Sequence, residues 1–130
     1  MVKTKPIDKD SYLGYQKKAY HAFETMNLAL ENKLWTAAGR EAVFVCINMS
    51  DALLAKHNGL RNISKDHMDV VKVVATVLPM SDRKNQSNRL RKVIQMKNLI
   101  DYESREFSEK SANDIALQAT RFYEWGNQYL

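Results

Sequence analysis

The feature that most constrains the fold is the stretch 35–57, WTAAGREAVFVCINMSDALLAKH. Apolar residues recur in it at spacings of three and four, which place them on one stripe of a helix: Trp35, Ala38, Ala42, Val45, Met49 and Leu53. Other apolar residues fall on the flanks or the far side: Val43, Phe44, Ile47 and Leu54. A helix that is apolar nearly all round must be covered on several sides. The stretch therefore predicts the central rod of a bundle, or a helix with one face against a second chain.

The rest of the chain predicts an all-α fold. Its 130 residues suit one domain, residues 1–130, and its 4 glycines and 2 prolines are too few for the turns of a β-sandwich or barrel. We expect an up-and-down bundle of about five helices after a polar lead, residues 1–10. The expected helices begin at Asp10 or Ser11, at Trp35, after a Ser64 cap, at Ser87 or Asn88, and at Ser108 or Ser111. The expected loops include 60–63 and 79–87.

The same composition indicates a soluble, cytoplasmic protein. The single cysteine, Cys46, lies in an apolar run and reads as a small buried side chain, which fits a reducing compartment. The first residues lack the apolar core of a signal peptide, and no apolar stretch approaches the roughly 20 residues of a membrane span. The three histidines lie far apart, and no HExxH, CxxC, P-loop, GxGxxG or GxSxG motif occurs. We therefore expect no metal and no cofactor.

Basic residues gather in one part of the chain. The net charge of +5 favours anionic partners, and the segment 83–97 holds six basic residues without an acidic one: Arg83, Lys84, Arg89, Arg91, Lys92 and Lys97. On a helix Arg89 and Lys92 share one side, where both could meet a phosphate backbone. The alternative is a solvated helix face whose charge keeps the protein soluble.

Two short segments contain residue types suited to acid–base or phosphate chemistry. In the first, Arg61 could stabilise a developing negative charge while His67 moves a proton. In the second, Lys97 could contact phosphate, Asn98 could orient a partner and Tyr102 could donate a hydrogen bond. The alternatives are a chance spacing for the first pair and an ordinary helix end for the second segment.

Residues 11–130 as a whole resemble HEPN domains (higher eukaryotes and prokaryotes nucleotide-binding). The run AAGREAVFVCINMSDALLAKHNGLRNISKDH is similar to the family's second helix, a small-residue turn and a histidine that opens the third helix, here Asn58-Gly59 and His67. The stretch MKNLIDYESREFSEKSANDIALQATRFYEW is similar to the last third of the family. The resemblance implies a helical bundle that dimerises, often with a role in RNA biology. Some members partner nucleotidyltransferases, and active members are metal-independent ribonucleases.

The sequence departs from the active HEPN pattern. Active members carry an Arg, a polar residue and a His four to six residues after the Arg, and two such motifs face each other in the dimer. Before the last helix this chain has Lys97-Asn98 and then Tyr102, and Lys lacks the planar fork of Arg while Tyr, with a pKa near 10, is a poor base. Arg61-Asn62 and His67 satisfy the spacing but follow the second helix.

Three hypotheses follow. The favoured one is a symmetric HEPN-like homodimer that binds RNA or a protein partner, such as a nucleotidyltransferase, with little or no cleavage, in a toxin–antitoxin or defence type of system. The alternative is a metal-independent endoribonuclease that uses Arg61 and His67, or Lys97 and Tyr102. The third is a helical protein-interaction module.

Overall fold

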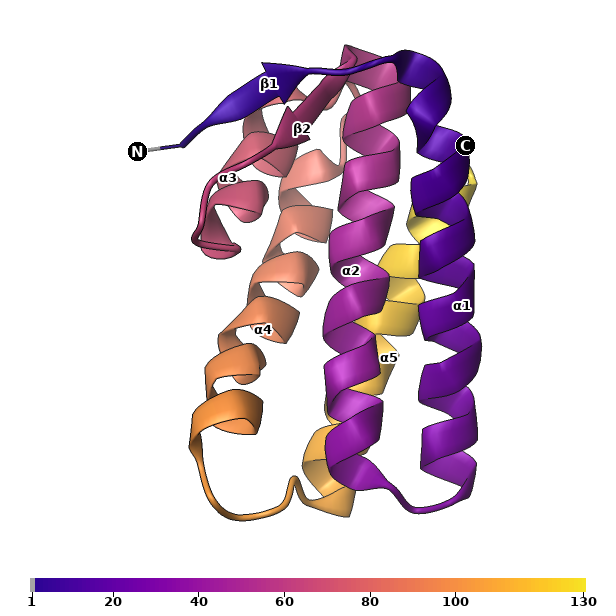
Figure 1. The fold of residues 1–130 in the computed structure, drawn as a ribbon, viewed down its shortest axis with the longest axis vertical. Coiled ribbons are helices and arrows are strands. Elements are labelled where there is room, and N and C mark those ends of the chain that lie inside the picture. The colour runs from indigo at the N-terminus through magenta and orange to yellow at the C-terminus, as the bar shows by residue number, and fades with distance from the viewer. Residues whose placement is uncertain (1) are drawn as a thin grey trace.

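The computed structural model describes residues 2–130, and within them the chain forms a bundle of five α-helices (Figure 1). The helices are α1 Tyr12–Glu31, α2 Trp35–Asn58, α3 Met68–Val77, α4 Arg83–Tyr102 and α5 Glu109–Asn127. Four of them run up and down along the long axis, with α1 and α2 joined at one end and α4 and α5 joined at the same end. The shorter α3 packs beside α4. The prediction of an all-α, up-and-down bundle is confirmed.

Helix α2 is the central rod of this bundle. It contacts α1, α3, α4 and α5, and its buried side chains lie on several sides of the helix: Ala38, Ala42, Val43, Val45, Cys46, Met49, Leu53 and Leu54 among them. The first of the two alternatives for the stretch 35–57 is therefore the one observed. The apolar side chains around α2 are covered largely by the chain's own helices. Phe44 is the large apolar side chain of α2 that stays exposed.

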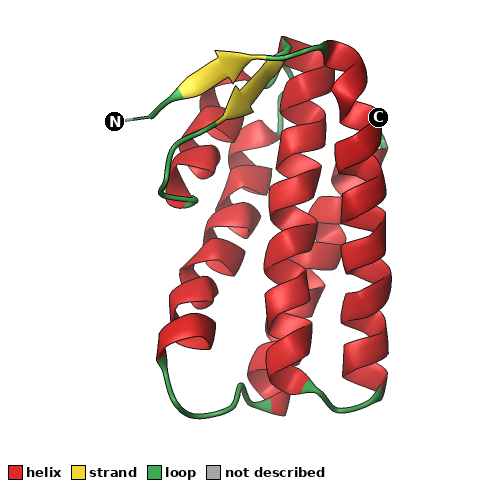
Figure 2. Cartoon of the chain, viewed as in Figure 1, coloured by secondary structure: helices red, strands yellow, loops and turns green. Residues whose placement is uncertain are grey.

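Two short strands correct the sequence-based assignments at the top of the bundle. The lead and the loop after α2 pair as antiparallel strands, β1 Thr4–Pro6 and β2 Leu60–Asn62, with Lys5 opposite Arg61 (Figure 2). A 3₁₀ turn, η1 Lys9–Ser11, then leads into α1. Residues of both strands are exposed or half-buried, so no alternation of apolar and polar side chains marked them in the sequence.

Two predicted helix starts were also wrong. Helix α3 begins at Met68, because the Met68 N–H donates to the Asp66 carboxylate at 2.8 Å, whereas the Ser64 hydroxyl instead accepts from the Lys3 N–H at 2.6 Å. Helix α4 begins at Arg83, one turn before Ser87.

Arg83 explains the early start of α4. Its guanidinium donates to the carbonyls of Ala75 at 3.1 Å and Met80 at 3.2 Å, which closes the turn between α3 and α4. The predicted ends of α2 and α3 are confirmed. Helix α3 ends at Val77, before Pro79, and Gly59 ends α2 with φ +61°. Ser108 caps α5 by accepting from the Ser111 N–H at 3.0 Å. No helix in residues 2–130 is long and apolar enough to cross a membrane.

Candidate functional site

Arg61 and His67 line the same hollow at the top of the bundle. This first hollow has a volume of about 320 Å³ and is lined from α2, β2 and the start of α3 by Ile47, Asp51, Arg61, Asn62, Ile63, Ser64, His67 and Val70. Arg61 is the middle residue of β2 and lies opposite Lys5 of β1, so the strand pair fixes its backbone. His67 immediately precedes α3 and serves as its N-terminal flanking residue. The fold therefore places both members of the first candidate pair at one cavity.

His67 also lines a second hollow, which contains the other candidate segment. That hollow, of about 450 Å³, is lined by Lys65, Asp66, His67, Met68, Ile94, Lys97, Asn98 and Tyr102. It lies between the segment that enters α3 and the last turns of α4. The two candidate segments, which lie some thirty residues apart in sequence, thus meet at His67.

A third hollow lies next to the first two. It lies between α2 and α4, has a volume of about 230 Å³, and is lined by Arg40, Val43, Phe44, Ile47, Lys97, Ile100 and Asp101. It shares Ile47 with the first hollow and Lys97 with the second. We call the three adjoining hollows the α2–α3–α4 site. Sequence reasoning missed its contributions from α2, because Asp51 and Phe44 stand in a run that reads as core.

Two of the cations that line the α2–α3–α4 site, Lys97 and Arg61, have a carboxylate neighbour. The Lys97 Nζ lies 3.0 Å from the Asp101 Oδ2, and the Arg61 Nε lies 4.0 Å from the Asp51 Oδ2. The side chain of Asp51 is 8% exposed, and burial raises its pKa to about 6 against the opposing effect of Arg61 and Lys18. The Arg61 Nε is buried without a hydrogen bond, while the side chain as a whole is 42% exposed. Lys97 is therefore hydrogen-bonded to its carboxylate neighbour, whereas Arg61 lies near Asp51 without a hydrogen bond, and both cations keep N–H groups free.

The surroundings of His67 favour the neutral form of its imidazole. Burial lowers the pKa of its imidazole, the Lys97 ammonium lowers it further, and Asp66 and Asp101 oppose the shift. At pH 7 the ring is therefore uncharged, with one nitrogen able to accept a proton or a hydrogen bond and the other able to donate. An uncharged imidazole near the Arg61 and Lys97 cations can bind a phosphodiester. It can also accept a proton next to a bound phosphodiester.

The six basic residues of the segment 83–97 lie in several different environments. Arg83 closes the α3–α4 turn, and Arg89 donates to the Gln118 side chain of α5 at 3.2 Å. Lys84 and Arg91 instead lie on an exposed stripe of α4 with spacings of four and three, the outer stripe: Lys84, Asn88, Arg91, Gln95, Asn98 and Tyr102. The outer stripe contains no acidic residue, and its last two members line the α2–α3–α4 site.

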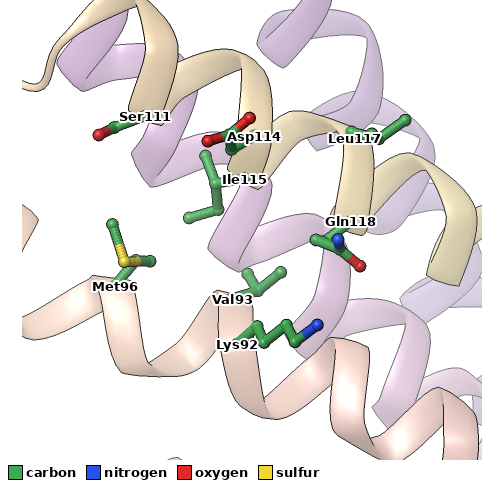
Figure 3. A pocket seen from close by; sticks show the side chains of 8 residues that line it. All are labelled: Lys92, Val93, Met96, Ser111, Asp114, Ile115, Leu117 and Gln118. Carbon is green, nitrogen blue, oxygen red and sulfur yellow. The ribbon is translucent and has the colours of Figure 1, made fainter.

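Lys92 faces a separate groove between α4 and α5 (Figure 3). Val93, Met96 and Ile115 form much of its apolar lining, and Lys92 and Gln118 lie toward one end while Ser111 lies toward the other. Asp114 also lines the groove, from the α5 side. This groove is distinct from the α2–α3–α4 site, which contains the two candidate segments.

No three His, Cys, Asp or Glu side chains gather into a metal-binding group within residues 2–130. The chain matches no protein-family model, no curated protein and no solved structure.

Proposed function

We propose that the protein binds single-stranded RNA at the α2–α3–α4 site, as a HEPN-like helical module. The observation that carries the proposal is the position of His67, which lines both the hollow of Arg61 and the hollow of Lys97, Asn98 and Tyr102. Two segments with phosphate-binding residue types therefore share one site. The net charge of +5 supports an anionic ligand.

Lys97 and Arg61 would provide the phosphate contacts. The Lys97 ammonium has three donors and uses one on Asp101, so two are free for a phosphate oxygen. Arg61 directs its buried Nε edge toward Asp51, and its two Nη groups remain to contact a second phosphate. Because the hydrogen bond to Asp101 already restrains the Lys97 side chain, less conformational entropy is lost when Lys97 binds a phosphate.

Tyr102 supplies the preference for unpaired bases. Its side chain is 81% exposed at the end of α4, an unusual position for an aromatic ring that no packing requires. An exposed ring next to cations is the stacking platform of many single-strand binding sites. The outer stripe of α4 offers amides and two cations, Lys84 and Arg91, along which the strand would continue away from the ring.

The test is equilibrium binding of a fluorescent single-stranded RNA, followed by anisotropy at several salt concentrations. We expect Lys97→Met and Arg61→Met each to weaken binding and to reduce the salt slope by about 0.7 for each lost phosphate contact. Tyr102→Ala should weaken binding by about ten-fold, since stacking contributes roughly 1–3 kcal/mol per base, whereas Tyr102→Phe should bind like wild type. Lys110→Met, an exposed change on α5, is the control. Wild-type affinity in Lys97→Met, Arg61→Met and Tyr102→Ala alike would refute the proposal.

Cleavage of the bound RNA is the second candidate function, and the neutral imidazole of His67 favours it. His67 would take the proton of a ribose 2′-hydroxyl, whose oxygen then attacks the adjacent phosphorus. The 5′-oxygen of the next nucleotide leaves and takes the Tyr102 hydroxyl proton, and a 2′,3′-cyclic phosphate remains. Arg61 and Lys97 would stabilise the charge on the phosphorane-like transition state.

A cleavage assay without metal separates the two functions. Wild type, His67→Ala and Tyr102→Phe are each incubated with RNA in excess EDTA. Cleavage by wild type that is lost in His67→Ala and slowed in Tyr102→Phe would establish the ribonuclease. RNA that stays intact while wild type binds it would leave the module as a binding protein.

A further inference from the structure

The outward face of α1 exposes large apolar side chains for which the chain itself provides no cover. Leu13, Tyr20 and Leu28 are 58%, 50% and 57% exposed, although a Leu or Tyr on a helix normally packs inward. Exposed Lys17 and Glu24 stand between them on the same face. Helix α1 packs against α2 and α5 and forms one edge of the bundle in Figure 1. We call these five residues the α1 stripe.

The α1 stripe is complementary to itself. The twofold axis would pass between Tyr20 and His21, at the centre of the stripe. It would place Leu13 opposite Leu28 and Lys17 opposite Glu24, and Tyr20 opposite the exposed His21 beside the stripe. A surface that pairs with its own rotated copy is what a twofold-symmetric interface requires. We propose that two copies of this chain associate through antiparallel α1 helices.

The charges select the antiparallel arrangement. With the two helices parallel about a twofold axis, Lys17 would face Lys17 of the other copy and Glu24 would face Glu24, which repels. With the helices antiparallel, both contacts become Lys–Glu pairs. Within residues 2–130 neither Lys17 nor Glu24 takes part in an ion pair, so both are free to pair across the interface.

The size of the α1 stripe indicates a weak dimer. From Leu13 to Leu28 a helix rises about 22 Å, and one such helix per partner provides far fewer contacts than the roughly 20–30 residues a side of a standard interface. We therefore expect dissociation in the micromolar range. The α3 and α4 walls of the α2–α3–α4 site stay accessible in this dimer, because α3 and α4 lie on the other side of the bundle from α1. Arg61 of the site lies 5.3 Å from the ring of Tyr15, an α1 residue that is not part of the α1 stripe.

Sedimentation velocity of the full chain from about 1 to 200 µM, at low salt, tests the proposal through reciprocal charge changes. Lys17→Glu alone and Glu24→Lys alone should each weaken the homodimer at least ten-fold, because each variant faces two like charges. An equimolar mixture of the two variants should form a heterodimer with affinity close to that of wild type. The double variant Lys17→Glu/Glu24→Lys should dimerise like wild type.

Two controls keep the outcome interpretable. Lys110→Glu reverses an exposed charge on α5 and should not change the association, and circular dichroism of each variant shows that the bundle is folded. A wild type that is monomeric at 200 µM would overturn the proposal. So would a dimer that ignores both single charge reversals, which would assign association to another face, or a double variant that stays as weak as the single ones.

Discussion

The Nε of Arg61 on strand β2 lies 4.0 Å from the buried carboxylate of Asp51 on helix α2. The guanidinium of Arg61 also lies 5.3 Å from the centroid of the Tyr15 ring on α1. These contacts connect the small sheet to two helices of the bundle and hold Arg61 at the first hollow. Structural support and ligand binding therefore both depend on the Arg61 side chain.

Asp51→Asn should stabilise the fold increasingly as the pH rises. The Asp51 pKa is about 6 in the folded protein and near 3.8 in the unfolded chain, so between these values the folded form holds a proton that the unfolded form has lost. Stability from this group is thus lost as the pH rises through that window. We expect the difference in unfolding free energy between variant and wild type to grow by roughly 1 kcal/mol from pH 5 to pH 7.5.

Urea unfolding at the two pH values measures this difference. Glu124→Gln, which removes an exposed carboxylate on α5 away from the α2–α3–α4 site, is the control. A difference for Asp51→Asn that shrinks toward pH 7.5 would mean that Arg61 stabilises the charged carboxylate more than burial opposes it.

RNA binding should strengthen on acidification through His67. Its lowered pKa keeps the imidazole neutral until the pH falls below its ordinary value near 6.5, and protonation then adds a positive charge between Arg61 and Lys97. Anisotropy titrations from pH 7.5 to pH 5 should show tighter binding with a midpoint below 6.5. His67→Gln should remove most of this pH dependence, and the same acid response in that variant would assign it to another group.

Deletion of residues 2–6 should loosen the first hollow without unfolding the bundle. Strand β1 pairs with β2 over Thr4–Pro6 and carries no buried side chain, so its loss removes backbone hydrogen bonds from β2 but little core. Hydrogen exchange should accelerate at residues 60–64, and RNA affinity should fall because Arg61 is less well fixed. The melting temperature should change by a few degrees at most, and cooperative loss of the bundle would show that β1 is structurally essential.

The helices could be predicted because their patterns are local. The spacings in 35–57 fixed α2 as a rod with apolar residues on several sides, and Asn58-Gly59 and Pro79 marked two helix ends. The strands could not be predicted, since they are joined by backbone hydrogen bonds between segments more than fifty residues apart, and neither strand is buried. The start of α4 at Arg83 depended on carbonyls that only the folded α3–α4 turn brings within reach.

The candidate site was visible in the sequence only as separate parts. Arg61, His67 and Lys97 stood out by residue type, but their convergence depends on how α3 and α4 pack, which no short spacing encodes. Asp51 was not distinguishable from the polar residues of a helix interior, because its importance comes from burial beside a strand that the sequence did not reveal. The basic residues of 83–97 could not be told apart in the sequence, because they are of the same type. The structure gives Arg83, Arg91 and Lys92 different surroundings.

Gly126→Ala should destabilise the bundle, because this glycine of α5 packs directly against side chains of α2. A Cβ at Gly126 would collide with the side chain of Met49, which is itself fully buried, and would lie 3.4 Å from Leu53. Extra volume in a packed core costs about 1–3 kcal/mol. Gly14→Ala on α1 is the matched control: no atom lies within 4 Å of its added Cβ, so it should instead stabilise the helix by up to about 1 kcal/mol. Thermal unfolding of both variants at low micromolar concentration would show opposite shifts, and a Gly126→Ala protein as stable as wild type would mean that Met49 can repack into free space.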